Sequence, residues 1–313
     1  MKKFICIFIF MLLMSCAESD KSYPSKNITL VVPYSPGGAS DTAARIYAQL
    51  LEHKLNVPVI VENRTGGAGA IGLSYVQNSK PDGYTIAYMP VESVMLESLG
   101  HVQMKPSDFQ FIGGGTIVPS ALTVSSSSPW TNYEQFITYA KNNPNKVRVG
   151  NSGPGSIWHL AASALGDAEG VQFTHVPFEG GATAVAALLG NHIEAVTVSE
   201  SEVEAGVADG SLRVLASMRK DRGELPQNVP VLNEMGKDLS MIGWGAFAVP
   251  AGTPKEVLEV LMPASEAVLQ SDDFKNQVTG RGLIHGYQNS KDMQEFAQDQ
   301  YEFFIPLIKN LNN

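Results

Sequence analysis

Four loops of this sequence place glycines and hydroxyl side chains where a predicted strand gives way to a predicted helix. They span residues 34–41, 63–69, 152–156 and 177–183. Glycines let a ligand approach the backbone, and the free N–H groups of a helix's first turn attract negative charge. In an open parallel α/β sheet such loops lie together beyond the carboxyl ends of the strands. Each loop alone is equally compatible with an ordinary turn, but the four together predict an anion-binding cleft.

The polar side chains of these loops indicate how an anion would be held. Ser35, Ser40 and Ser152 supply hydroxyl donors. His159 lies one turn into the helix after the third loop, where it either touches the ligand or fixes the turn, and both interpretations stay open.

Three further side chains are weighed as ligand contacts. Arg64 is a candidate carboxylate clamp, because a guanidinium binds a carboxylate bidentately. Arg45 stands four residues after Asp41, which is more typical of a local ion pair. Trp244, between two glycines, is more typical of core or hinge packing than of a stacking platform.

The catalytic motifs in the chain are incomplete. Residues 67–72 fit the G-x-G-x-x-G dinucleotide pattern, but an exported protein meets little free dinucleotide, and only Glu92 stands near the place of the ribose-binding acid. Residues 150–154 approach the G-x-S-x-G elbow, yet Pro154 replaces the last glycine, and a hydrolase built on Ser152 and His159 lacks an acid partner. The six histidines follow no zinc-binding spacing. We therefore expect no catalysis, no metal and no cofactor.

The N-terminus has the features of an export signal. Lys2 and Lys3 precede an apolar run at residues 4–14, which is too short to span a bilayer as a helix. The residues Leu-Met-Ser-Cys at 13–16 resemble a bacterial lipobox and predict that Cys16 is lipidated. A small-residue cleavage site around Ser15, giving a freely soluble periplasmic protein, is the alternative. We expect a signal peptide at 1–16, a tether at 17–25 and a periplasmic location.

The charge of the chain excludes other partners. The net charge is −9, and removal of the two lysines in residues 1–15 makes it −11. Nucleic acids and anionic membrane surfaces need basic patches, so neither is an expected partner. The chain has only two cysteines, and the mature protein keeps at most Cys16, so no disulfide is expected. An anionic ligand must therefore be bound by local donors and helix ends.

Strand-like and helix-like segments alternate along the chain, which predicts an α/β fold with two doubly wound sheets joined by a hinge. The pattern restarts after four serines and a proline at 125–129. We expect lobe 1 at 26–124 and 244–313, and lobe 2 at 125–243. The predicted strands are 27–33, 57–62, 84–89, 146–150, 171–176, 194–198, 212–217 and 243–250. The predicted helices are 41–54, 69–78, 133–142, 156–165, 182–189, 253–269 and 292–311.

Several long runs resemble one protein family. They include YPSKNITLVVPYSPGGASDTAAR, VPVIVENRTGGAGAIG, KPDGYTI, VRVGNSGPGSIWHLA, VPFEGGATAVAALLGNHIEA, ELPQNVPVLNEMG and FAVPAGTPKEV. In this order and spacing they are similar to the substrate-binding proteins of tripartite tricarboxylate transporters, the TctC-like or Bug family. The resemblance covers nearly the whole mature chain. It implies a two-lobed periplasmic-binding-protein (Venus flytrap) fold.

The resemblance also implies the ligand, the partner and the contacts. A small organic (di)carboxylate, citrate-like, C4 or aromatic, would bind between the lobes of a monomeric receptor that serves a two-subunit membrane permease. A sensing protein that serves a receptor kinase is the alternative. The implied ligand-binding residues are Tyr34, Ser35, Pro36, Gly37, Gly38, Ala39, Ser40, Asp41, Ala68, Ser152, Gly153, Gly155, Ser156, His159, Pro177, Phe178, Gly181 and Ser199.

Two acidic residues depart from the family pattern. Glu179 stands where many members carry a basic residue, and an inward-pointing acid there would disfavour highly charged tricarboxylates. One interpretation is that Glu200 faces an amine or hydroxyl of the ligand. The favoured interpretation is that Glu179 and Glu200 are both solvated residues at the rim of the cleft.

Overall fold

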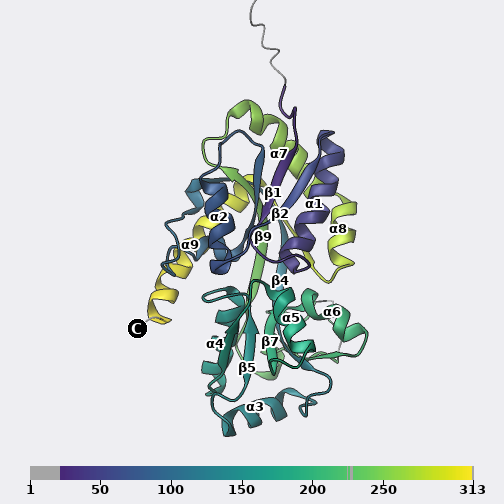
Figure 1. Cartoon of the computed structure of the whole chain (residues 1–313), viewed down its shortest axis with the longest axis vertical. Coiled ribbons are helices and arrows are strands. Elements are labelled where there is room, and N and C mark those ends of the chain that lie inside the picture. The colour runs from purple at the N-terminus through teal and green to yellow at the C-terminus, as the bar shows by residue number, and fades with distance from the viewer. Residues whose placement is uncertain (1–21, 224, 226–227, 312–313) are drawn as a thin grey trace, which may run out of the picture.

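The computed structural model of the chain describes residues 22–223, 225 and 228–311 (Figure 1). The predicted signal peptide at 1–16, with Cys16, lies outside these residues, as does part of the predicted tether. Among the described helices, none is both long and apolar enough to cross a membrane. Lipidation of Cys16 therefore stays a prediction from the sequence.

Lobe 1, the upper half of Figure 1, is built on a parallel α/β layer. Strands β2, β1 and β3 pair in parallel in that order, and β9 pairs antiparallel with β3. Helices α1 and α8 lie on one side of the sheet, and α2 and α9 lie on the other (Figure 1). The bounds are β1 Ile28–Val32, α1 Ala39–Leu55, β2 Val59–Asn63, α2 Ala70–Gln77, β3 Thr85–Pro90, β9 Ile242–Pro250, α7 Lys255–Leu269, α8 Asp272–Thr279, β10 Ile284–Gln288 and α9 Ser290–Leu311.

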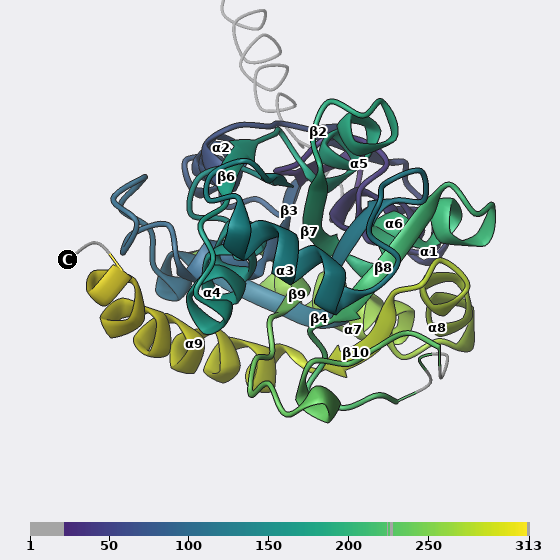
Figure 2. The same cartoon turned by 90° about the horizontal axis from the view of Figure 1, so that it is seen from below.

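Lobe 2 repeats this plan with a smaller sheet. Strands β6, β5 and β7 pair in parallel, and helices α3 and α4 lie toward the viewer when the molecule is seen from below (Figure 2). The bounds are α3 Tyr133–Asn142, β5 Arg148–Asn151, α4 Ile157–Glu169, β6 Thr174–Pro177, α5 Gly181–Leu189, β7 Ala195–Ser199, α6 Glu200–Ala208 and β8 Leu212–Ser217.

Two long antiparallel strands connect the lobes. Strand β4, at Phe109–Ser125, pairs with β9 as far as Pro119 and with β7 from Ser120 onward. We propose that the boundary between the lobes follows this change of partner, at 119/120 and near Ile242. The sequence pattern places the first crossing a few residues later, at 124/125. Paired strands can bend together at such a crossing without breaking their hydrogen bonds, which suits a hinge.

Strand β4 goes unpredicted from the sequence because Gly113, Gly114, Gly115 and Pro119 interrupt its apolar pattern. The pairing with β9 shifts register twice in this stretch. A Cβ atom on Gly115 would lie 3.0 Å from the side chain of Leu269 and 3.2 Å from that of Phe274. The glycines therefore let helices α7 and α8 pack directly on the strand.

Candidate functional site

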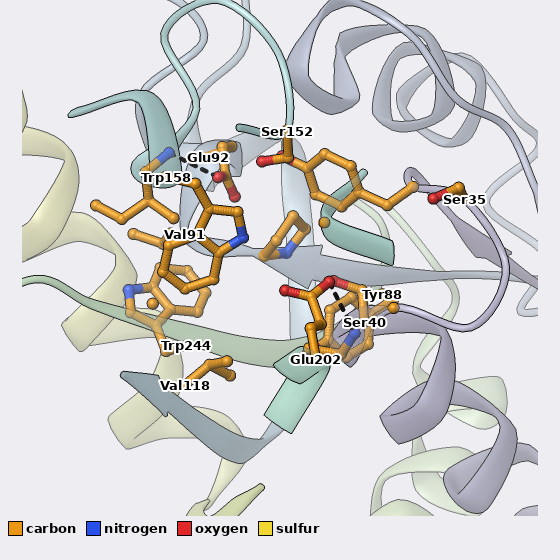
Figure 3. A pocket seen from close by; sticks show the side chains of 17 residues that line it. Ser35, Ser40, Tyr88, Val91, Glu92, Val118, Ser152, Trp158, Glu202 and Trp244 are labelled. Carbon is orange, nitrogen blue, oxygen red and sulfur yellow. Dashed lines mark hydrogen bonds between the residues drawn. The ribbon is translucent and has the colours of Figure 1, made fainter. Parts of the chain in front are cut away.

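A cavity lies between the two lobes, where the loops after β1 and β3 face the loop after β5 and the start of α5 (Figure 3). Its free volume is about 30 Å³, which holds a water molecule or two but no organic acid. The lobes are therefore closed on one another. The lining residues are Tyr34, Ser35, Gly38, Ala39, Ser40, Tyr88, Pro90, Val91, Glu92, Val118, Ser152, Ile157, Trp158, Gly181, Glu202, Gly243 and Trp244.

A second cavity of about 200 Å³ adjoins the first, because Tyr34 and Ser152 line both. The glycine-rich loop of lobe 1 faces two loops of lobe 2 across it. The Tyr34 hydroxyl donates a hydrogen bond to the carbonyl of Ala68 at 3.2 Å and so forms part of the wall between the two spaces. The remaining lining residues are Gly66, Gly67, Ala68, Gly69, Gly153, Pro154, Pro177, Phe178 and Glu179.

Two buried hydroxyl groups line the first cavity, one from each lobe. Ser35 and Ser152 are 6% and 3% exposed, and neither Oγ atom has a hydrogen-bond partner among the described residues. A buried hydroxyl without a partner is costly, so such groups are expected to bond to a ligand or to water. Ser35 belongs to lobe 1 and Ser152 to lobe 2, so one small ligand could engage both lobes.

The first loop is held in shape by Asp41. Its carboxylate accepts hydrogen bonds from the Gly37 N–H at 2.9 Å, from Arg45 Nε at 2.8 Å and from Asn63 Nδ2 at 2.8 Å. Burial opposes ionisation of Asp41, but these donors outweigh it and lower the pKa of the carboxyl. The predicted local ion pair between Asp41 and Arg45 is confirmed. Asp41 thus supports the loop from outside the cavity.

The third loop is held in a similar way by His159, Ser156 and Asn151. His159 Nδ1 accepts the Gly155 N–H at 2.9 Å, and Ser156 Oγ caps α4 by accepting the His159 N–H at 3.2 Å. Asn151 Oδ1 accepts the Gly153 N–H at 3.0 Å. His159 lines neither cavity, so of its two interpretations the structure favours fixation of the turn.

His159 should make the stability of the protein sensitive to acid. Burial, with a smaller effect of His175, lowers the pKa of His159 to about 4. The unfolded chain, with an ordinary pKa near 6.5, then takes up the proton first. The stabilising contribution is therefore complete above about pH 6.5 and is lost as the pH falls toward 4.

We expect wild type to lose about 1 kcal/mol more stability than His159→Asn between pH 7 and pH 5, after allowance for partial solvent screening. Denaturant unfolding at both pH values measures this. Parallel losses in the two proteins would contradict the assignment.

Three contacts cross the cleft and join the lobes. The Ser35 N–H donates to the Glu179 carbonyl at 3.2 Å. The Ala39 N–H, in the first turn of α1, donates to Glu202 Oε1 at 3.3 Å. The Ile157 N–H, in the first turn of α4, donates to Glu92 Oε1 at 2.9 Å. Each of two helix N-termini is therefore bonded to a glutamate of the opposite lobe.

The structure brings together about two thirds of the residues predicted to bind the ligand. Those that line one cavity or both are Tyr34, Ser35, Gly38, Ala39, Ser40, Ala68, Ser152, Gly153, Pro177, Phe178 and Gly181. Those that line neither are Pro36, Gly37, Asp41, Gly155, Ser156, His159 and Ser199. Most of this second group shape the loops or cap the helices.

Ten residues of the first cavity are missed as ligand contacts by sequence reasoning, among them Glu92, Trp158, Glu202 and Trp244. Trp244 is interpreted from the sequence as packing, and Glu92 enters only through the dinucleotide pattern. Glu202 has a local signal, because Ser199 and Glu202 form the S-x-x-E pattern of a capping box, which the structure contains.

Of three charged residues discussed from the sequence, two lie away from the cavities and one lies at the rim of the second cavity. Glu200 forms an ion pair with Arg219 and accepts a hydrogen bond from Ser217, so it does not face the ligand cavity. Arg64 pairs with Glu62 and covers the ring of Tyr75, so it is no clamp in this cleft. Glu179 is exposed at the second cavity, as a rim residue would be.

Two α/β lobes that close over a small polar cavity define a solute-binding receptor. A family model described as "Tripartite tricarboxylate transporter family receptor" (TctC) matches residues 43–313. The chain belongs to this family, as the sequence resemblance predicts.

Individual relatives support the assignment along most of the chain. The "UPF0065 protein in gbd 5'region" of Cupriavidus necator is 29% identical over 94% of this chain and 90% of its own length. A ligand-free TctC solute-binding protein from Polaromonas is 36% identical, with a TM-score of 0.65 over 92% of this chain and 99% of that one. Rpa4515 of R. palustris, solved with adipate, is 26% identical, with a TM-score of 0.85 over 92% and 97%. These similarities confirm the predicted two-lobed periplasmic-binding-protein fold.

Proposed function

We propose that this receptor captures a small organic carboxylate between its lobes and delivers it to a membrane permease of one large and one small subunit. The observation that carries the proposal is the pair of unpartnered hydroxyls, Ser35 and Ser152, which line the same cavity from the two lobes. Hydroxyl donors bind a carboxylate strongly when water is excluded. The adipate in the R. palustris relative supports a carboxylate as the ligand class.

Binding requires the lobes to open and close. The cavity of about 30 Å³ is small for an organic acid, and hydrogen bonds join the lobes across it, so we infer that the lobes separate when a ligand enters. The Polaromonas protein is more similar in sequence than the R. palustris protein but has the lower TM-score, as a different angle between lobes would produce. We infer hinge motion along β4 and β9.

We infer binding without turnover. Ser152 Oγ has no hydrogen-bond partner among the described residues, and His159 Nδ1 is already bonded to the Gly155 N–H. A serine nucleophile needs a base within hydrogen-bond reach of its hydroxyl. The arrangement supports a ligand donor at Ser152 instead of a nucleophile.

The test is a screen of organic acids against the purified protein by thermal shift, followed by calorimetry. At least one carboxylate should bind saturably, and at 100 times its Kd it should stabilise the fold by about 2.7 kcal/mol. The acid should be recovered unchanged. Binding only of compounds without a carboxylate, such as sugars or simple amines, would overturn the proposed ligand class.

We also propose that Cys16 carries a lipid anchor, on the strength of the Leu-Met-Ser-Cys motif alone. Cys16→Ser is expected to move most of the protein from the membrane fraction to the soluble periplasmic fraction, because two or more acyl chains give stable anchoring. Cell fractionation and intact-mass measurement check this. An unmodified mass for the wild-type protein would show that the freely soluble alternative is correct.

A further inference from the structure

Two glutamates face the cavity from opposite lobes, and the proposed binding of a carboxylate uses neither of them (Figure 3). Glu92 comes from the short helical turn η2, Val91–Val94, of lobe 1, and it is 2% exposed. Glu202 comes from α6 of lobe 2. A ligand that is only negative would therefore meet two acidic side chains in the space that should bind it.

The Glu202 carboxylate lies where three helices begin. Its Oε1 accepts the Ala39 N–H of α1 at 3.3 Å, and its Oε2 accepts the Ser199 hydroxyl and N–H of its own helix at 2.7 and 3.1 Å. A Cβ atom on Gly181, the first residue of α5, would lie 2.2 Å from Oε1. Helix N-termini attract anions, and here the protein's own carboxylate occupies the place of one.

Glu92 does the same at the opposite wall. Its Oε1 accepts the N–H of Ile157, the first residue of α4, at 2.9 Å. The helix starts behind the first and third loops, which the sequence pattern predicts as anion sites, are thus both bonded to glutamates. Among the described residues that line this cavity, the buried side-chain donors without a partner are the hydroxyls of Ser35 and Ser152 and the indole N–H of Trp244.

The charge balance of the cleft favours a positive group on the ligand. Within the described residues, the charged side chains that line the two cavities are Glu92, Glu202 and Glu179, with no lysine, arginine or histidine. Burial raises the pKa of the Glu92 and Glu202 carboxyls, although their hydrogen-bond donors partly oppose it. A dicarboxylate would bring two negative charges beside these acids in a closed, poorly hydrated space, whereas an ammonium group would favour their ionised form and offset its charge. The indoles of Trp158 and Trp244 also line the cavity, and an indole ring is a good partner for a cation.

We propose that Glu92 and Glu202 set the ligand class of this receptor as an amino-acid-like zwitterion. The carboxylate of the ligand binds unpartnered donors of this cavity, and its ammonium group lies between the two glutamates. This inference rests on the proposed function, since it presupposes a carboxylate ligand in this cleft. It narrows that class from organic acids in general to those that also carry a protonated amine.

Matched ligand pairs test the proposal directly. Succinate and β-alanine, glutarate and 4-aminobutyrate, and adipate and 5-aminopentanoate differ only in whether one end is a carboxylate or an ammonium. Calorimetry on the full mature protein at neutral pH should show the amino acid binding at least roughly tenfold more tightly than its diacid at the spacer length that fits. The proposal is wrong if no amino acid of the series binds, or if the diacids bind more tightly.

Amide variants assign the preference to the glutamates. Glu92→Gln and Glu202→Gln keep an oxygen for the Ile157 and Ala39 N–H groups but remove the charge, so each should reduce the preference for the amino acid by roughly tenfold. Glu134→Gln, at an exposed residue of α3 that lines neither cavity, is the matched control and should leave the ratio unchanged. Melting temperatures near the wild-type value show that the variants fold. If the ratio of diacid to amino-acid Kd is unchanged in both cavity variants, the glutamates do not cause the preference and the proposal is wrong.

The binding data separate a wrong zwitterion class from a wrong assignment as a carboxylate receptor. If diacids bind well and amino acids do not, the receptor is still a carboxylate receptor and only the zwitterion class is wrong. If simple alkylamines bind and no carboxylate does, the proposed function itself is wrong.

Discussion

Replacing Phe247 with alanine is expected to lower the free energy of unfolding by about 3–5 kcal/mol. Phe247 lies on β9, one of the two strands that join the lobes, and it is fully buried. Its ring stacks on Tyr47 of α1 at a centroid distance of 3.7 Å and meets Tyr88 of β3 edge-on at 5.5 Å. Truncation removes both ring contacts and leaves a cavity that rigid neighbours cannot fill.

Denaturant unfolding followed by circular dichroism measures this loss. Tyr47 is fixed by a 2.7 Å hydrogen bond to Ser265, so its ring is poorly placed to move into the gap. Phe303→Ala is the matched control, because this side chain is 58% exposed on α9, and its loss should cost within about 0.5 kcal/mol. A loss below about 1 kcal/mol for Phe247→Ala would show that the crossing strands repack easily.

Removing both cleft hydroxyls in Ser35→Ala with Ser152→Ala is expected to weaken carboxylate binding by roughly a hundredfold or more. Each hydroxyl would donate to a charged group, and such a bond contributes about 1.5–3 kcal/mol. In the free protein neither Oγ has a partner among the described residues, so the substitutions should not lower stability. Loss of affinity without loss of melting temperature is the expected signature.

Calorimetry with a carboxylate from the ligand screen measures the effect. Each single variant should raise the Kd by about the square root of the factor found for the double variant. Ser127→Ala, an exposed serine that lines neither cavity, is the control. Full affinity in the double variant would show that the carboxylate binds elsewhere in the cleft. That outcome would overturn the site without excluding a solute receptor.

Most of the strands and helices of the two lobes can be predicted from the local sequence pattern. Most predicted strands and helices agree with the structure to within a few residues, as for the helix at 133–142, which matches Tyr133–Asn142. Short apolar strands followed by small-residue loops have few alternatives, because side-chain periodicity and helix capping act over a few residues. Local pattern does not predict strand β4, because the glycines that interrupt it are needed for close packing of helices α7 and α8, which come from distant parts of the chain.

The sequence by itself determined the loops that form the walls of the cleft and the local supports, such as the Asp41–Arg45 pair, that shape them. Only the tertiary structure decided what faces the ligand. Glu202 lies 163 residues from Ala39, and Glu92 lies 65 residues from Ile157, so no short-range pattern reports these contacts. They form because closure of the two lobes brings each helix N-terminus, with its free N–H groups, against a carboxylate of the opposite lobe.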